Sequence, residues 1–126
     1  ALGADGVILS NHGGRQLDSA LSPMETLSET RCLVDKPVLI DSGFRRGADI
    51  IKALALGADM VLLGRAALYG LAVAGEQGVI DIIRLLKEDI DRTLAHLGAP
   101  AVSALGPSFI RQRCAPAGDD REAEWR

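Results

Sequence analysis

The sequence Ala55-Leu56-Gly57-Ala58-Asp59-Met60-Val61-Leu62-Leu63 repeats, with few changes, the sequence Ala1-Leu2-Gly3-Ala4-Asp5-Gly6-Val7-Ile8-Leu9 that begins 54 residues earlier. In the later copy a helical pattern leads in, so Gly57 suits the left-handed residue that ends a helix, and the apolar run behind it suits a strand. A third apolar run, Pro37-Val38-Leu39-Ile40, lies between the two copies. None of the runs alternates polar with apolar residues, which predicts parallel strands buried on both faces.

Helical patterns follow the predicted strands. Ser22-Pro23-Met24-Glu25 has the form of a capping box with proline in the first turn, which predicts a helix through about Arg31. Further helices are predicted at about 47–56 and 66–74, so strand-helix units follow one another along the chain. Residues 78–97 have the apolar spacing of a long helix with one buried stripe, ended by Gly98, and the stripe consists of Val79, Ile82, Ile83, Leu86, Ile90, Leu94 and Leu97.

Composition and charge narrow the class of protein. The 126 residues include 14 Lys+Arg and 17 Asp+Glu, a net charge of −3, and the basic residues are scattered, so nucleic acid is not expected as a partner. Cys32 and Cys114 lie far apart with no zinc-ligand spacing, which indicates a reduced, cytoplasmic chain without a metal site. The uncharged runs are too short to predict a membrane span. Because Ala1 begins as though inside a helix, we expect a piece of a longer protein, with a disordered tail at 111–126.

Glycine and arginine occur together in the loops that follow the predicted strands. The loops are Ser10-Asn11-His12-Gly13-Gly14-Arg15-Gln16-Leu17-Asp18, then Asp41-Ser42-Gly43-Phe44-Arg45-Arg46-Gly47, then Gly64-Arg65. Glycine lets backbone N–H groups approach an anion, a helix start adds a positive dipole end, and arginine donates two parallel hydrogen bonds. The second and third loops therefore predict one shared phosphate site.

The first loop adds a histidine. His12 and Arg15 lie three positions apart, so a helical turn would bring them to one side. A neutral imidazole can accept a proton, and a guanidinium can hold a carboxylate. This pair indicates removal of a proton from a substrate that carries a carboxylate.

Together these loops resemble the FMN-dependent α-hydroxy acid dehydrogenases and oxidases. The three loops, with Lys52-Ala53-Leu54-Ala55-Leu56-Gly57-Ala58 and Leu63-Gly64-Arg65, follow the family signature in order and spacing, and the resemblance runs from Ala1 to about Ile110. Within the family the motifs are most similar to the mandelate dehydrogenases, and lactate and glycolate remain open as substrates.

The resemblance implies an α/β fold in which residues 1–110 form the C-terminal part of a (β/α)8 barrel, about three βα units plus the terminal helix. It also implies that the full-length protein uses FMN to oxidise a 2-hydroxy acid to the 2-oxo acid. By position, His12 is the catalytic base, Arg15 binds the substrate carboxylate, and the residues that contact FMN are Asp41, Ser42, Gly43, Phe44, Arg45, Gly64 and Arg65.

The family's active-site lysine, tyrosines and aspartate belong to segments that this sequence does not contain. We therefore expect the chain alone to be poorly folded and inactive. The full-length protein is expected to be a homo-oligomer in the cytoplasm or against the inner membrane, with its electron acceptor left open. Two alternatives fit the same sequence: a phosphate-binding barrel enzyme without flavin, and a non-catalytic fragment.

Overall fold

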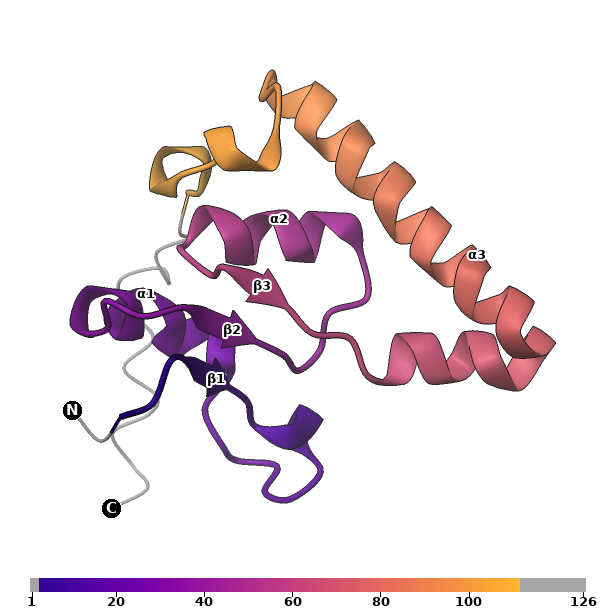
Figure 1. Cartoon of the computed structure of the whole chain (residues 1–126), viewed down its shortest axis with the longest axis horizontal. Helices are drawn as coiled ribbons and strands as arrows, with labels where there is room; N and C mark the ends of the chain where they lie inside the picture. The colour runs from indigo at the N-terminus through magenta and orange to yellow at the C-terminus, as the bar shows by residue number, and fades with distance from the viewer. Residues whose placement is uncertain (1–2, 112–126) are drawn as a thin grey trace, which may run out of the picture.

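The computed structural model describes residues 3–111 and contains strand-helix units in series (Figure 1). In chain order the elements are β1 (Val7–Leu9), η1 (His12–Gly14), α1 (Pro23–Leu33), β2 (Val38–Ile40), α2 (Gly47–Ala55), β3 (Met60–Val61), α3 (Arg65–Leu97), η2 (Val102–Ala104) and η3 (Pro107–Phe109). The order confirms the predicted series of strands and helices. The tail expected to be disordered lies outside the described residues, except for Arg111.

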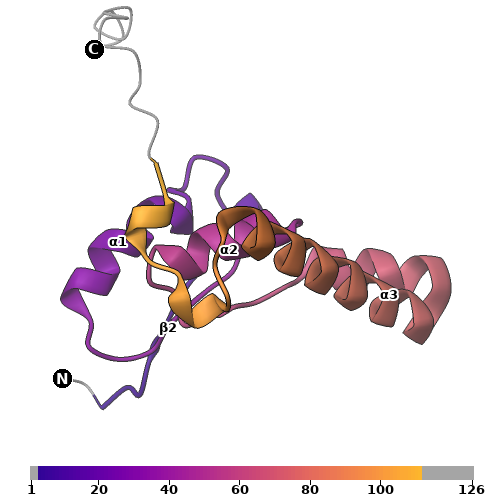
Figure 2. The same cartoon turned by 90° about the horizontal axis from the view of Figure 1, so that it is seen from above.

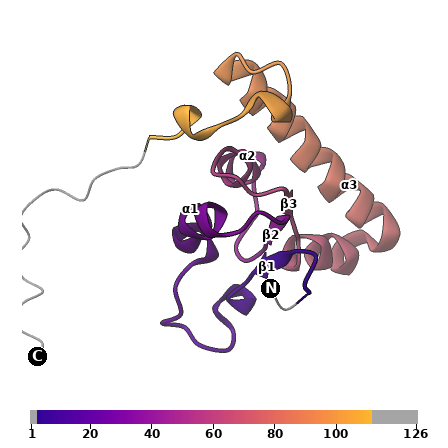
Figure 3. The ribbon, with the colours of Figure 1, turned by 60° about the vertical axis from the view of Figure 1, so that its left-hand side comes forward.

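The strands form one parallel sheet in the order β1-β2-β3. Helices α1 and α2 lie on the same side of the strands (Figure 3), as right-handed strand-helix-strand connections require. Their apolar side chains pack against the strands in one buried cluster, which consists of Leu27, Val38, Ile40, Phe44, Ile50, Ala53, Ala58 and Leu86. This core fixes how the ends of the strands, and the loops that follow them, lie relative to one another.

The opposite face of the sheet is open among the described residues, whereas the apolar runs predict its burial in the longer protein of which this chain is expected to be a piece. Ile8, Leu39 and Met60 form one row across the three strands. The side chain of Ile8 is 59% exposed and that of Met60 is 53% exposed. The apolar runs have apolar side chains on both faces of the sheet, but within residues 3–111 other elements cover only one of these faces.

The start of α1 has the predicted capping box. The backbone N–H of Met24 donates to Ser22 Oγ at 3.3 Å, and the backbone N–H of Ser22 donates to Glu25 Oε2 at 2.8 Å. Pro23 opens the helix, where its missing N–H costs nothing. The helix ends at Leu33, two residues beyond the predicted end.

The two helices predicted at 66–74 and 78–97 are joined into α3, with a sharp bend between them (Figure 1). The bend lies at Ala74 (φ −145°) and Gly75 (φ 59°). The two parts touch through Gly70 and Gly78, since a Cβ on Gly78 would lie 1.9 Å from the Gly70 carbonyl oxygen. Only glycine pairs allow backbones to come this close, and this contact holds the bend.

The second part of α3 packs against α2 and reaches well beyond it (Figure 2). Leu86 and Leu94 of the predicted stripe are buried, whereas Ile83 and Leu97 are exposed, so the stripe is narrower than predicted. At the crossing, a Cβ on Gly47 would lie 2.5 Å from the backbone nitrogen of Ile90. The close crossing anchors the start of α2, which directly follows the loop after β2.

By length and mean hydropathy alone, α3 could cross a membrane, although its uncharged runs are short. The bend at Ala74–Gly75 divides it into a first part much shorter than a bilayer and a second part with charged residues on most turns. Neither part is a straight apolar span.

Candidate functional site

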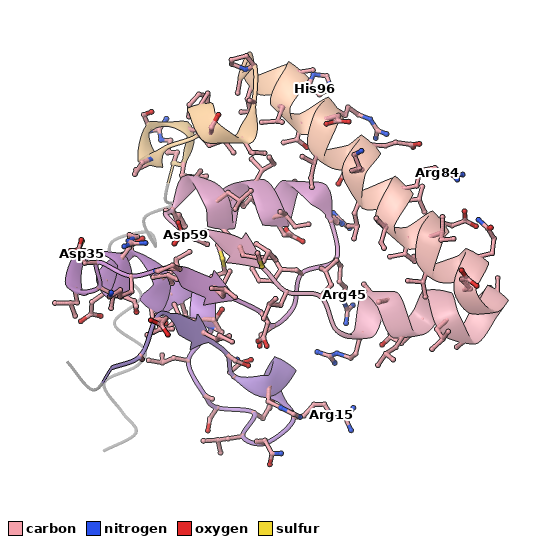
Figure 4. All side chains as sticks on the ribbon, in the orientation of Figure 1. Arg15, Asp35, Arg45, Asp59, Arg84 and His96 are labelled. Carbon is pink, nitrogen blue, oxygen red and sulfur yellow. The ribbon has the colours of Figure 1, made fainter. Side chains whose placement is uncertain are left out.

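The loops that follow the three strands meet at one end of the sheet, because the carboxyl ends of parallel strands share an edge. A cavity of about 480 Å³ lies there. Its lining includes every residue for which the sequence predicts a role, namely His12, Arg15, Asp41, Ser42, Gly43, Phe44, Arg45, Gly64 and Arg65. Figure 4 shows Arg15 and Arg45 at this end of the sheet and Asp59 toward the other end.

The cavity lining also includes residues that sequence reasoning did not single out: Gly13, Leu62, Leu63, Ala66 and Leu68. The apolar run predicts Leu62 and Leu63 as part of the third strand, but β3 ends at Val61, and these leucines follow it in the loop. The pair of glycines after His12 was a signal for Gly13, since it marks a backbone that other groups approach closely.

The first loop makes a single turn with left-handed backbone angles. His12, Gly13 and Gly14 have φ values of 55°, 65° and 72°. The N–H of Arg15 donates to the His12 carbonyl at 3.4 Å, and the N–H of Gly14 donates to Asn11 Oδ1 at 3.2 Å. The predicted turn between His12 and Arg15 is therefore present. Within it His12 has a left-handed backbone conformation, which is unusual for a residue other than glycine. Both side chains are exposed at the cavity.

The second loop turns sharply just after β2. Ser42 and Gly43 have φ values of 76° and 87°, and the turn sends the Phe44 side chain into the core, where it is only 7% exposed. Phe44 therefore borders the cavity with only a small part of its surface. Arg45 follows as an exposed side chain at the cavity.

The third loop leads directly into α3. Gly64 precedes the helix, and the N–H groups of Ala67 and Leu68 donate to its carbonyl at 3.1 and 3.3 Å. The N–H groups of Arg65 and Ala66 precede these in the first turn, where a helix supplies no acceptor of its own. Together with the helix dipole, these amides have the chemistry that suits an anion at the cavity.

The start of α2 is different, because a carboxylate from α3 caps it. Asp89 Oδ2 accepts a hydrogen bond from the backbone N–H of Gly47 at 2.6 Å. Gly47 does not line the cavity. Of the two helix starts near the site, the one at Arg65 is thus open to an anion from the cavity.

Positive charge dominates the cavity lining. The lining contains three guanidinium groups, those of Arg15, Arg45 and Arg65, and one carboxylate, that of Asp41. A Cβ on Gly43 or on Gly64 would meet no atom within 4 Å, so both backbones border open space against which a ligand can lie. These features suit a ligand with a phosphate group, while His12 and Arg15 suit a second ligand that bears an acid.

Comparison with known proteins identifies relatives of this chain. Residues 1–112 match the model of the family described as FMN-dependent dehydrogenase. The chain is 66% identical to (S)-mandelate dehydrogenase of Pseudomonas putida over 111 residues, which cover 88% of this chain and 28% of that protein. It is 46% identical to L-lactate oxidase of Nostoc sp. over 110 residues, which cover 86% of this chain and 30% of that protein.

A solved structure agrees with these relatives. The crystal structure of (S)-mandelate dehydrogenase, described as a monotopic membrane protein, superposes with a TM-score of 0.87 at 65% identity and covers 88% of this chain and 30% of that one. The chain therefore spans less than a third of the length of the relatives it matches. This confirms the prediction that the fold is part of a (β/α)8 barrel. The roles of the individual cavity residues stay predictions.

Proposed function

The chain belongs to the family of FMN-dependent dehydrogenases, and we propose on that basis that the protein containing it oxidises a small 2-hydroxy acid to the 2-oxo acid with FMN as its cofactor. The observation that carries this proposal is the composition of one cavity. Glycine and arginine of the second and third loops, whose chemistry suits a phosphate, border the same space as His12 and Arg15 of the first loop, whose chemistry suits a substrate acid.

The phosphate end of FMN would be held by Arg45, Arg65 and the first-turn amides of α3, with the backbones of Gly43 and Gly64 close to the cofactor. The open space in front of both glycines and the excess of guanidinium groups support this fit. When bound, FMN supplies the acceptor for the electron pair that leaves the substrate.

The substrate end is formed by His12 and Arg15. Arg15 can hold the carboxylate of a 2-hydroxy acid through two parallel hydrogen bonds, which fixes the orientation of the neighbouring carbon. His12 then accepts a proton from the substrate, whether the hydrogen on the α-carbon leaves as a proton or as a hydride. The product keeps its carboxylate and gains a carbonyl group.

Among 2-hydroxy acids we propose mandelate first and lactate second. The 66% identity to (S)-mandelate dehydrogenase, against 46% to L-lactate oxidase, supports this order. A hydrophobic contact with a phenyl group would come from Leu62, Leu63 or Leu68 or from parts of the barrel that this chain does not include.

For the location of the full-length protein we propose the cytoplasm, with peripheral association to the inner membrane. The relative described as a monotopic membrane protein supports the second part. Fractionation of cells that express the full-length protein tests both. The expectation of a homo-oligomer also stays a prediction, which native mass spectrometry of the full-length protein can check.

The proposed reaction is tested by colour. The purified full-length protein should be yellow, and its flavin absorbance should bleach without oxygen when a 2-hydroxy acid is added. A matched control is the same acid without the hydroxyl group, which should leave the spectrum unchanged. A colourless protein would favour a phosphate-binding barrel enzyme without flavin, and a yellow protein that no 2-hydroxy acid bleaches would contradict the proposed substrate class.

A further inference from the structure

The loop that carries His12 is held by a hydroxyl group from the next loop. The backbone N–H of Asn11 donates to Ser42 Oγ at 3.3 Å, and the backbone N–H of Gly13 donates to the same oxygen at 3.1 Å. These two N–H groups belong to the residues on either side of His12. One side-chain oxygen thus holds the peptide group that follows His12 and the peptide group between Ser10 and Asn11.

The Ser42 hydroxyl is itself fully engaged. Its hydrogen is donated to Asp41 Oδ1 at 2.5 Å, which leaves both lone pairs to accept from Asn11 and Gly13. A hydroxyl can make one donated and two accepted hydrogen bonds, so this arrangement uses its whole capacity. The direction of the O–H bond, and with it the position of the lone pairs, is set by the Asp41 carboxylate.

Two residues of the loops joined by this contact have backbone conformations that are strained for residues other than glycine. His12 has a φ of 55° and Ser42 has a φ of 76°, in the region that non-glycine residues rarely adopt. Such conformations persist where surrounding contacts hold them, and they occur often at functional sites. Here the held residue is His12, and the contacts include the hydrogen bonds to Ser42 Oγ, the bond from the His12 N–H to Ser10 Oγ and the bond from Arg65 to the Gly13 carbonyl.

We propose that Ser42 is a positioning residue, which acts through its hydroxyl group to hold His12 at the substrate side of the cavity. The family resemblance places Ser42 beside the cofactor, whereas its hydroxyl group is directed to the His12 loop. The inference rests on the proposed function, because it gives His12 the role of the base. It also predicts that the second loop, which contains Ser42, and the first loop, which contains His12, move as one unit.

The test compares Ser42→Gly, Ser42→Ala and the control Ser28→Ala in the full-length, FMN-loaded protein. Glycine removes the hydroxyl and is unstrained at a φ of 76°, so the variant keeps the fold of the loop, whereas alanine removes the hydroxyl and keeps the strain. Ser28 lies on the exposed side of α1 and tests the loss of a serine hydroxyl remote from the cavity.

Two readouts are measured. Hydrogen-deuterium exchange of the peptide that contains residues 11–13 should become faster by roughly tenfold in both Ser42 variants, which corresponds to about 1.4 kcal/mol. The kcat for the 2-hydroxy acid should fall by a similar factor of roughly ten, while the Kd for FMN changes less than about twofold. Ser28→Ala should change none of these quantities.

The outcomes separate the possible failures. Unchanged exchange at residues 11–13 in Ser42→Gly overturns the proposal whatever happens to the rate. A fall in kcat matched by an equal loss of FMN affinity also overturns it, since Ser42 would then act on the cofactor. If the parent protein oxidises no 2-hydroxy acid, the proposed function fails, and the exchange measurement still decides whether Ser42 holds the loop.

Discussion

Arg65 Nη2 donates a hydrogen bond to the carbonyl oxygen of Gly13 at 3.1 Å, and so connects the start of α3 with the loop after β1. The two residues are 52 positions apart in the sequence. A Cβ on Gly13 would lie 2.6 Å from this nitrogen, so a side chain there would displace the end of Arg65. The predicted phosphate ligand Arg65 therefore also supports the loop of the predicted base.

The close approach of Arg65 predicts different effects for the two neighbouring glycines. Gly13→Ala and Gly14→Ala both put a side chain at a positive φ, which costs about 1 kcal/mol, but only the Cβ at Gly13 meets Arg65. In the full-length protein we expect Gly13→Ala to lower both Tm and FMN affinity, and Gly14→Ala to lower Tm alone. Equal FMN affinities in the two variants would contradict the role given to this contact.

Arg65→Ala should weaken FMN binding. Charge-assisted hydrogen bonds to a phosphate contribute about 1.5–3 kcal/mol, so we expect the Kd for FMN to rise roughly ten- to hundredfold. The control is Arg84→Ala, since Arg84 lies on the exposed side of α3, far from the cavity, and pairs with Asp81 at 3.7 Å (Figure 4). FMN titration of the apoprotein measures both, and the same Kd in the two variants would exclude Arg65 from the phosphate site.

His12→Gln should remove the base without removing the cofactor. Loss of a general base lowers rates by about 10²–10⁴-fold, and glutamine keeps hydrogen-bonding capacity but cannot take up the proton. We expect the variant to be yellow. In stopped-flow measurements a 2-hydroxy acid should reduce its flavin more slowly by this factor. His96→Gln, at the far end of α3, is the matched control (Figure 4). Near-normal reduction by the His12 variant would end its assignment as the base.

Arg15→Lys should raise the KM for 2-hydroxy acids, because a lysine cannot form two parallel hydrogen bonds with a carboxylate. Loss of one charge-assisted hydrogen bond predicts a rise of roughly tenfold or more. The 2-hydroxy amide, which lacks the carboxylate, serves as a comparison substrate. Steady-state kinetics should show a large effect of the variant for the acid and a small effect for the amide. The same effect on both would mean that Arg15 does not bind the carboxylate.

The 126-residue chain by itself should neither fold cooperatively nor oxidise 2-hydroxy acids. The row of Ile8, Leu39 and Met60 is a sheet face with apolar residues exposed to water, and β1 and β3 have unpaired edges among the described residues. We expect strong binding of a hydrophobic dye and a broad thermal transition. A sharp transition together with tight FMN binding by the isolated chain would contradict this expectation.

The local parts of the fold could be predicted from the sequence because the signals are local. Ser22 and Glu25 form the capping box from residues three positions apart, Gly98 ends α3 in the left-handed conformation, and each apolar run contains its strand. The meeting of the three loops at one cavity also followed from the sequence, since a parallel sheet places all its carboxyl ends at the same edge.

The contacts that build the site depended on the tertiary structure. The sequence did not indicate that Phe44 enters the core between two cavity residues, that Ser42 Oγ accepts from Gly13, or that Asp89 caps α2. Each of these contacts depends on how separate elements pack together. The last two are hydrogen bonds between residues 29 and 42 positions apart. The sequence alone determined which residue types border the cavity. Which atom bonds to which was decided only when α1 and α2 packed on the sheet and α3 packed on α2, because hydrogen bonds depend on differences of less than an ångström that no local pattern encodes.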